Sequence, residues 1–382
     1  MKRIFRQLLN GLLAAVLAGA LTACSAAPAA SRTQAGGAKA EAFQGSSKAA
    51  DSEAGTLEVH YIDVGQGDCV LVRCDGHSML IDTGDYSKGT AIQNYLQKQN
   101  VEKLDYLVLT HPDSDHIGGA PVIITKFEID KVFMSNFEKD NKTYQKLIQA
   151  LDNKYLKYTT PDVGAQYWLG AAEITILAPN AAYDNPNDAS IALMLRNGEN
   201  RFLFTGDAGE DAEQDMLENG MDLSADVYKA GHHGSRTSTS QKFFEAVRPS
   251  CAVISCGEDN SYGHPHAETL NTFRMNGVEV YRTDEDGTII ATSDGKTIAF
   301  NVPASETWKS GEANGNGSVW EVPAPAESSS DTSAITYVLN TGSMKFHSPS
   351  CNSLPTSNRQ DTSESREAII AQGYEPCQRC NP

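Results

Sequence analysis

The residues best suited to chemistry gather at residues 110–119 of this 382-residue chain, which read THPDSDHIGG. Two imidazoles, His111 and His116, and two carboxylates, Asp113 and Asp115, fall within six residues, directly after an apolar run. Such side chains can converge at the end of a strand if a tight loop folds around positive charge, because the carboxylates otherwise repel each other. Imidazole with carboxylate suits zinc, manganese or iron. The spacing therefore predicts a divalent metal site; a polar surface turn is the alternative.

This loop resembles the H-x-[HD]-x-D-H motif of the metallo-β-lactamase superfamily. Other motifs of that superfamily follow in its order, namely LIDTG at 80–84, FTGD at 204–207 and GHPH at 263–266. The resemblance covers about residues 56–302. It implies an α/β domain with the four-layer αββα metallo-β-lactamase fold and the activity of a metallo-hydrolase.

Within the superfamily, the chain most resembles the hydrolase domain of ComEC-type DNA-uptake competence proteins. The motifs that carry this resemblance are IDVGQGD at 62–68, KAGHHGS at 229–235 and YRTDEDG at 281–287. Two departures from the wider superfamily point the same way. Asp113 stands where many relatives have a second His, and NDAS at 187–190 stands where many have another His ligand. More oxygen ligands make manganese as suitable as zinc.

The resemblance implies a pair of divalent ions, zinc or manganese, in the core. The ligands that it implies are His111, Asp113, Asp115, His116, Asp207 and His264. Asp207 is expected to bridge the two ions, and Asp82 to orient a ligand histidine without touching metal. Paired ions ease the formation of a bridging hydroxide, and the implied reaction is its in-line attack on phosphorus or carbonyl.

The resemblance leaves the roles of the adjacent His232 and His233 open. One is a candidate ligand and the other a general acid or phosphate contact; histidines simply buried in a loop are the alternative. Lys229 and Arg236 flank the pair and are candidate phosphate clamps, although Arg236 equally fits a solvated surface. The residues expected to act in catalysis are Asp115, Lys229, His232 and His233. A structural loop near the site, rather than direct chemistry, is expected of Asp63, Gln66 and Asp68.

Periodicity outlines the elements that must position these residues. Alternation at 57–62 and short apolar runs at 69–73 and 79–81 predict strands, the latter two joined by an Asp75–Gly76 turn. Helical periods are expected at 91–97, 144–151, 238–246 and 266–275, and further strands at 104–109, 174–177, 191–195, 202–204, 252–255, 278–281 and 289–291. Strands that first run together and then alternate with helices indicate a layered α/β domain.

Composition limits the choice of partners. The formal net charge is −18, with 31 basic and 49 acidic residues, which argues against a broad basic surface for nucleic acid. A polyanionic substrate must therefore be held locally, by metal ions and a few basic side chains.

The first 24 residues predict a targeting segment rather than part of the fold. Basic residues precede an apolar stretch too short to span a membrane, and the segment ends in LTAC at 21–24. That ending resembles the lipobox of bacterial lipoproteins, which implies lipidation at Cys24 and an extracytoplasmic, membrane-anchored protein. A plain secretory signal is the alternative. Residues 25–55 are rich in Ala, Ser and Gly and predict a flexible tether.

The C-terminal residues predict a second, smaller unit. Residues 303–333 have the composition of a linker, and residues 334–382 are too few to fold readily without a staple. The side chains that could supply this staple as zinc ligands are His347, Cys351, Cys377 and Cys380. The module resembles the metal-binding domain of Ada-type DNA repair proteins, which weakly implies DNA contact. A disulfide between two of the cysteines is the alternative.

Together these features favour a nuclease or phosphodiesterase acting on DNA at the extracytoplasmic membrane surface. A phosphoesterase for cell-wall or choline-phosphate substrates is a second hypothesis. A surface DNA-binding lipoprotein that has lost catalysis is a third, which the complete ligand set disfavours.

Overall fold

The computed structural model describes residues 54–311 and, nearer the C-terminus, residues 337–349, 351, 354–362, 369–370, 372–377 and 379–380. The predicted targeting segment, with Cys24, lies outside the described residues, as do nearly all of the predicted tether and most of the predicted linker. Within the described part, no helix has the length and apolar character needed to cross a membrane.

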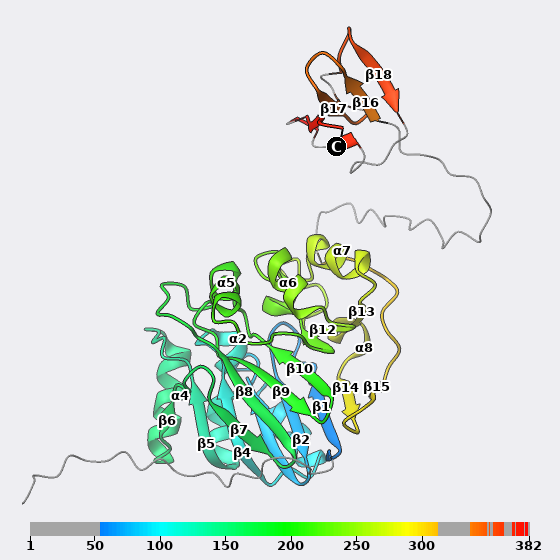
Figure 1. Cartoon of the computed structure of the whole chain (residues 1–382). Helices are drawn as coiled ribbons and strands as arrows, with labels where there is room; N and C mark the ends of the chain where they lie inside the picture. Colours follow the sequence, from blue (N-terminus) through cyan, green and yellow to red (C-terminus); the bar gives the residue numbers. More distant parts are fainter. Residues whose placement is uncertain are drawn as a thin grey trace, which may run out of the picture. The chain divides into compact units, whose positions relative to one another are not determined.

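Two mixed β-sheets form the centre of the main domain (Figure 1). The strands of the first sheet are, in order, β15 (Ile298–Phe300), β14 (Ile289–Ser293), β1 (Leu57–Tyr61), β2 (Val70–Cys74), β3 (His77–Ile81), β4 (Lys103–Leu109), β5 (Glu128–Met134) and β6 (Tyr158–Thr159). Those of the second are β13 (Glu279–Arg282), β12 (Cys251–Ile254), β11 (Val227–Lys229), β10 (Asn200–Phe204), β9 (Ala192–Asn197), β8 (Ala172–Ala178) and β7 (Gln166–Leu169).

Alternation along the strands divides the apolar residues between three cores. In β2, Val70 and Val72 join a buried cluster shared by both sheets, whereas Leu71 joins a cluster with the helices of the first sheet. In β10, Phe202 faces the shared cluster and Leu203 the helices of the second sheet. A strand buried on both faces in this way requires a covering layer on each side.

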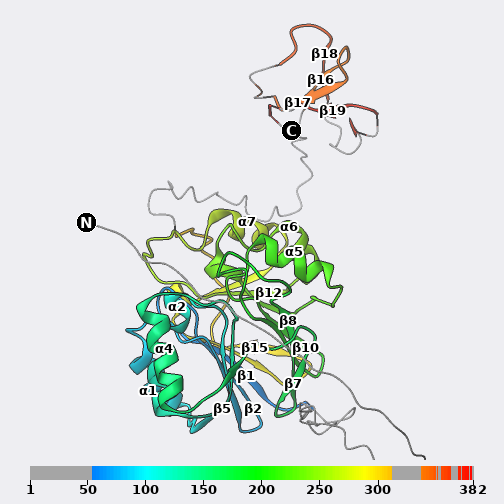
Figure 2. The same ribbon diagram turned by 90° about the vertical axis from the view of Figure 1, so that its left-hand side faces the viewer.

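Helices supply those outer layers (Figure 2). The helices packed on the first sheet are α1 (Gly89–Lys98), α3 (Ala120–Lys126) and α4 (Lys142–Asn153). The helices packed on the second are α5 (Glu210–Glu218), α6 (Gln241–Val247) and α7 (Ala267–Met275). The order of layers is therefore αββα, and the predicted fold class is confirmed.

The structure extends the domain past residue 302, where the composition predicts a linker. The backbone N–H of Ser305 donates to the carbonyl of Val280 at 2.7 Å, and that of Gly311 to the carbonyl of Pro265 at 3.0 Å. Trp308 packs against the apolar cluster beneath the helices of the second sheet. Residues 303–311 are held by backbone hydrogen bonds and one aromatic side chain. They contain no run of apolar residues, and for that reason their composition resembles that of a linker.

The C-terminal module has a sheet of its own. Its strands are, in order, β18 (Arg359–Thr362), β16 (Tyr337–Asn340), β17 (Lys345–His347) and β19 (Glu375–Pro376). Its buried apolar cluster contains Leu339, Phe346 and Ile369, with Tyr337 and Tyr374 partly buried beside it. So small a core needs a further stabilising element.

Candidate metal centre

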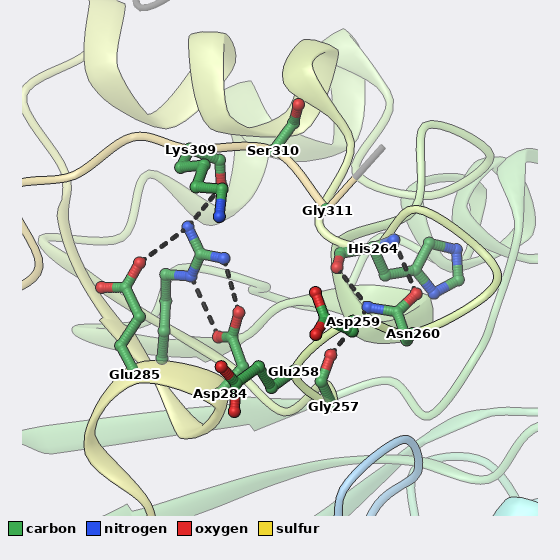
Figure 3. Close-up of a pocket in the computed structure, with 11 residues that line it drawn as sticks. Gly257, Glu258, Asp259, Asn260, His264, Asp284, Glu285, Lys309, Ser310 and Gly311 are labelled. Atoms are coloured by element: carbon green, nitrogen blue, oxygen red, sulfur yellow. Dashed lines mark hydrogen bonds and ion pairs between the residues drawn. The ribbon is translucent and has the colours of Figure 1, made fainter. Parts of the chain in front are cut away.

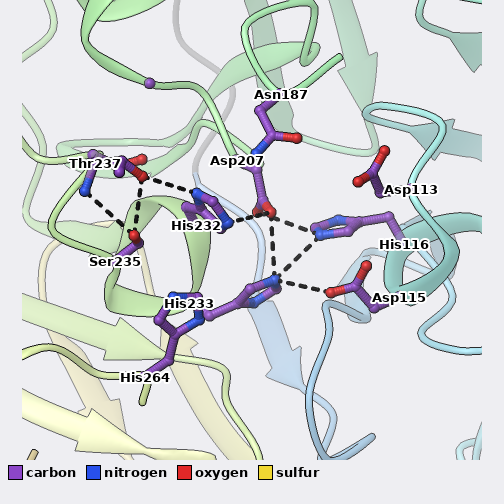
Figure 4. Close-up of polar contacts among 12 residues, drawn as sticks. Asp113, Asp115, His116, Asn187, Asp207, His232, His233, Ser235, Thr237 and His264 are labelled. Carbon is purple, nitrogen blue, oxygen red and sulfur yellow. Dashed lines mark hydrogen bonds and ion pairs between the residues drawn. The ribbon is translucent and has the colours of Figure 1, made fainter. Parts of the chain in front are cut away.

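The carboxyl ends of strands from both sheets meet at one edge of the sandwich. Parallel pairing aligns β3 with β4 in the first sheet, and β10 with β11 in the second. The residues that follow these four strands are Asp82, then His111 with Asp115 and His116, then Asp207, and finally His232 with His233. Ligand sites in α/β proteins commonly lie at such strand ends. Side chains far apart in the sequence converge here (Figure 4).

His116 is oriented by a buried carboxylate. Its Nδ1 lies 2.8 Å from Asp82 Oδ2, and Asp82 also accepts hydrogen bonds from Thr110 N at 2.8 Å and Thr110 Oγ1 at 2.6 Å. Because Nδ1–H donates to the carboxylate, the lone pair of Nε2 faces the opposite way, towards Asp207 Oδ1 at 3.3 Å. Asp82 thus sits behind a candidate ligand rather than among the ligand atoms.

His233 reaches the same point from the other sheet. His232 and His233 both have positive φ, 49° and 56°, in the short turn between Gly231 and Gly234. Such backbone is costly for residues with side chains and tends to occur at functional sites. His233 Nδ1 lies 3.0 Å from the carbonyl oxygen of Ser255, which only accepts, so Nδ1 carries the proton. His233 Nε2 lies 3.3 Å from His116 Nε2, 3.4 Å from Asp115 Oδ2 and 3.5 Å from Asp207 Oδ2.

Two imidazole lone pairs and two carboxylates therefore face one another at contact distance. Four buried residues, namely Asp68, His116, Asp207 and His233, each offer a ligand atom, and these atoms all lie within 4.8 Å of one another. Burial alone would lower the pKa of His116 and of His233, but Asp207 and the neighbouring carboxylates raise both pKa values well above 6.5. The cluster thus favours positive charge, which either protons or a divalent cation can supply.

Unsatisfied polar atoms make the same point. Asp68 Oδ1, His111 Nε2 and Asp207 Oδ1 are buried and have no hydrogen-bond partner among the described residues. Buried groups of this kind are costly unless something binds them. The donor set, nitrogen with oxygen in a buried pocket, fits zinc or manganese.

Asp207 lies between two groups of candidate ligands. Its Oδ1 faces His116, whereas its Oδ2 faces His233, His111 Nε2 at 3.8 Å and His232 Nε2 at 3.6 Å. Burial, followed by the charge of neighbouring His116, lowers the pKa of His111 to about 3, so His111 is neutral and available as a ligand. The central place of Asp207 suits the bridging role expected of it.

Two predicted ligands do not join the group. Asp113 Oδ1 binds Lys139 Nζ at 2.6 Å, and both side chains are about one-third exposed. Lys139, 26 residues away along the chain, supplies a counter-charge that the local sequence does not show. His264 is not among the four residues whose ligand atoms lie within 4.8 Å of one another, and its Nδ1 lies 3.3 Å from Gln66 Nε2. His233, brought inward by its left-handed turn, lies in the cluster where the resemblance led us to expect His264.

Lys229 does not serve as an accessible phosphate clamp. Its side chain is 2% exposed, and its Nζ lies 2.7 Å from Asp68 Oδ2. Arg236 Nε donates to Glu268 Oε1 at 3.0 Å on the surface. Asp68 was expected only to belong to a structural loop near the site, but it lies within the cluster of candidate ligands. Burial would raise its pKa, but Lys229 and His233 lower it to about 2, so it is a carboxylate within the cluster. The IDVGQGD motif was its only signal.

The C-terminal module holds a second candidate metal centre. His347, Cys351, Cys377 and Cys380 each offer a ligand atom within 4.8 Å of the others. The seven cysteines within the described residues are all free thiols, so the structure contains none of the disulfides considered from sequence. His347 Nδ1 is buried without a hydrogen-bond partner among the described residues. The backbone N–H of Arg379 lowers the pKa of the Cys377 thiol, which favours the thiolate that a metal requires. Three sulfurs and one imidazole fit a closed tetrahedral zinc site.

Comparison with known proteins agrees with the site and the fold. The family model described as metallo-beta-lactamase superfamily matches residues 62–258, just over half of the chain, and the chain belongs to this superfamily. It is 29% identical to "ComE operon protein 3" of Bacillus subtilis (strain 168) over 64% of this chain and 34% of that protein. It is 32% identical to "Competence protein ComA" of Neisseria gonorrhoeae over 59% of this chain and 31% of that protein.

These relatives are ComEC-type competence proteins, and the predicted resemblance is confirmed. The chain spans about a third of the length of each. Among solved structures, the metallo-beta-lactamase fold protein YhfI from Bacillus subtilis aligns with a TM-score of 0.44 and 14% identity, covering 63% of this chain and 100% of that one.

Proposed function

We propose that this chain is a metal-dependent phosphodiesterase that cleaves DNA. One observation carries the hydrolytic part: the Nε2 atoms of His116 and His233 face each other at 3.3 Å, with carboxylates of Asp115 and Asp207 beside them. Such an arrangement is stable only around positive charge. DNA as the substrate is supported by the likeness to competence proteins.

The protein's own residues prepare the site for this chemistry. When bound, divalent ions supply Lewis acidity and lower the pKa of a coordinated water, which is the source of the nucleophile in this class of hydrolase. Asp82 and Ser255 hold the ligand imidazoles by their Nδ1–H groups, so that both lone pairs point inward. Bound ions would also offer a phosphodiester local attraction on a protein of formal charge −18.

The test compares two substrates on the purified full chain, loaded with manganese or zinc. We expect cleavage of linear DNA and of bis(p-nitrophenyl) phosphate. Both rates should fall at least about 10²-fold for Asp207→Asn, since losing even an outer-shell partner of a metal site costs about 10–100-fold. Asp152→Asn, an exposed aspartate on α4, is the matched control and should cleave both normally. If the enzyme cleaves the small ester but does not cleave DNA, the substrate would instead be another phosphoester, such as a cell-wall or choline-phosphate compound. Bound metal without turnover on either would refute catalysis.

We propose further that Cys24 carries a lipid anchor and that the domain works outside the cytoplasm. The support is the sequence of residues 1–24, a basic start, an apolar stretch and LTAC before residue 25. Metabolic labelling with palmitate should mark the intact chain and fail to mark Cys24→Ala. Labelling of both would disprove the assignment.

A further inference from the structure

The loop between β1 and β2, with the sequence IDVGQGD at residues 62–68, contacts two histidines of the site in opposite ways. We infer that this loop determines the role of each histidine. It holds His233 with Nε2 unprotonated, as a cation ligand. It holds His264 with Nε2 protonated, as a hydrogen-bond donor to the substrate. This inference rests on the proposed phosphodiesterase function and names the residues that would contact the phosphate.

The orientation of the Gln66 amide determines the tautomer of His264. The backbone N–H of Gly257 can only donate, and its partner at 3.3 Å is Gln66 Oε1. The amide nitrogen, Gln66 Nε2, therefore faces His264 Nδ1, also at 3.3 Å. An amide nitrogen donates and does not accept, so Nδ1 must be the accepting nitrogen and the proton of the neutral ring must lie on Nε2.

His233 has the opposite arrangement. Its Nδ1 faces two acceptors, the carbonyl oxygen of Ser255 at 3.0 Å and Asp68 Oδ1 at 3.2 Å. Nδ1 therefore keeps its proton, which leaves Nε2, facing Asp115 and Asp207, as the nitrogen that a cation can bind. Lys229 holds the other oxygen of Asp68 at 2.7 Å and keeps that carboxylate in place.

The backbone around His264 is held firmly enough to make this tautomer useful. Asn260 Nδ2 donates to the carbonyl oxygen of His264 at 2.6 Å and to that of Gly257 at 2.9 Å. Asn260 Oδ1 accepts from His264 N at 3.0 Å. At Gly257 itself a Cβ would lie 2.6 Å from Gln66 N, so only glycine allows the two loops to approach this closely. His264 therefore has little freedom to turn away from Gln66.

The N–H of His264 is left for a ligand. Within the described part of the chain, His264 Nε2 has no hydrogen-bond partner, and the residue lines a cavity of about 420 Å³ with Asn260 and Gly257 (Figure 3). On its other side the ring lies 5.3 Å from that of His232 and 5.9 Å from that of His233, measured between centroids. The cavity carries the carboxylates of Glu258, Asp259, Asp284 and Glu285, which repel a phosphodiester. The N–H of His264 would therefore meet a phosphodiester oxygen on the side of the candidate metal centre, next to His232 and His233.

Substituting the amide tests the inference directly. In Gln66→Glu the side chain has the same length but only acceptors, so it should draw the proton of His264 to Nδ1 and leave Nε2 bare. We expect kcat for bis(p-nitrophenyl) phosphate to fall roughly 10²-fold, the size of effect seen when one donor to a developing oxyanion is lost. The metal content of the full chain should stay unchanged. Gln149→Glu, on the exposed side of α4, is the control for the added charge.

Two further measurements separate positioning from mere stability. Histidine-selective ¹⁵N spectra of the full chain, assigned with His264→Gln, should show protonated Nε2 in the natural protein and protonated Nδ1 in Gln66→Glu. The side-chain amide of His264→Gln can present an N–H near the former Nε2 position. If Gln66 acts only through the proton of the His264 ring, the double variant His264→Gln/Gln66→Glu should have the same kcat as His264→Gln alone, because the effects of coupled residues do not add.

Several results would overturn the inference while leaving the proposed function intact. These are a protonated Nδ1 on His264 in the natural chain, an unchanged kcat in Gln66→Glu, or loss of metal from that variant. If Gln66→Glu fails to fold, the spectrum of the natural chain still decides the tautomer. If the natural chain hydrolyses no phosphodiester but shows the expected tautomers, the proposed function fails and the hydrogen-bond assignment survives.

Discussion

At the scale of single residues, charge compensation explains why so many ionisable groups are buried together. Asp68 and Lys229 are 6% and 2% exposed, and their ion pair of 2.7 Å lies directly behind His233. Removing one partner of a buried pair leaves the other charge without compensation, which is far more costly than losing an exposed pair. Lys229 is therefore important for the stability of the site rather than for contact with the substrate.

The substitution Lys229→Met tests this role. We expect the free energy of unfolding of the full chain to fall by about 3–5 kcal/mol, because the carboxylate of Asp68 becomes a lone buried charge. The double variant Lys229→Met/Asp68→Asn should recover part of the loss, since the charge is then absent. Denaturant unfolding measures both. Lys103→Met, which breaks the exposed pair with Asp130, should change stability little. Equal effects at residues 103 and 229 would contradict the argument.

Part of the site could be predicted from sequence, and the division has a physical cause. His111, Asp115, His116 and Asp207 lie in motifs directly after strands, where local spacing sets the direction of the side chains. The choice between His233 and His264 depends on two successive left-handed residues, which no spacing rule predicts. Asp68 and Asp113 depend on partners distant in the sequence, Lys229 and Lys139. Long-range pairing is invisible to local patterns.

At the scale of elements, the alternating strands were predictable and the polar helix was not. The hairpin at Asp75–Gly76 is confirmed by the pairing of Cys74 with His77. Helix α5, by contrast, carries three acidic residues in its first turn and buries few apolar side chains, so its sequence shows no clear apolar stripe. One of those acids, Glu213, is itself fully buried. The reason for burying Glu213 is seen only in the folded structure, where its carboxylate contacts the turn before α6.

Glu213 joins α5 to the start of α6. Its carboxylate oxygens accept from Thr239 N at 2.5 Å and Ser240 N at 2.8 Å, and burial raises the pKa of Glu213 to about 7. Between about pH 4.5 and pH 7 the folded chain therefore binds a proton that the unfolded chain has released. Under those conditions the free energy of unfolding falls as pH rises, and levels off above pH 7.

We predict that this slope disappears in Glu213→Gln. The variant should be less stable overall. The glutamine amide has one accepting oxygen where the carboxylate has two, so one of the hydrogen bonds from Thr239 N and Ser240 N is lost. The difference in unfolding free energy between the natural chain and Glu213→Gln should shrink by roughly 3 kcal/mol from pH 5 to pH 8, since one pKa unit corresponds to about 1.4 kcal/mol. Urea unfolding across this range, on metal-saturated protein, gives the value. A pH-independent difference would show that Glu213 is charged throughout.

At the scale of the whole molecule, the chain combines two candidate metal centres of different chemistry. The main domain has large apolar cores on both faces of its sheets, so we expect apolar packing rather than metal to hold its fold. The C-terminal module has three fully buried apolar residues in its cluster, which is too little for independent stability. We therefore expect metal to serve catalysis in the main domain and folding in the C-terminal module.

This contrast predicts separable effects of metal loss. The full chain should bind up to three divalent ions, two in the main domain and one in the tail. Cys377→Ser/Cys380→Ser should lower that number by one, as measured by mass spectrometry of the elements, and leave hydrolysis of bis(p-nitrophenyl) phosphate unchanged. Asp207→Asn should abolish hydrolysis and keep the tail ion.

Limited proteolysis then distinguishes structure from catalysis. After chelation we expect rapid cleavage within residues 337–380, because the module loses the ligand bonds that offset its small core, whereas residues 54–311 should resist. The variant Cys377→Ser/Cys380→Ser should be cut in the same place even with metal present, and Cys251→Ser, at a thiol outside the tail cluster, should not. A tail that resists protease without metal would mean that its apolar cluster is sufficient, and that His347 and the three thiols have another purpose.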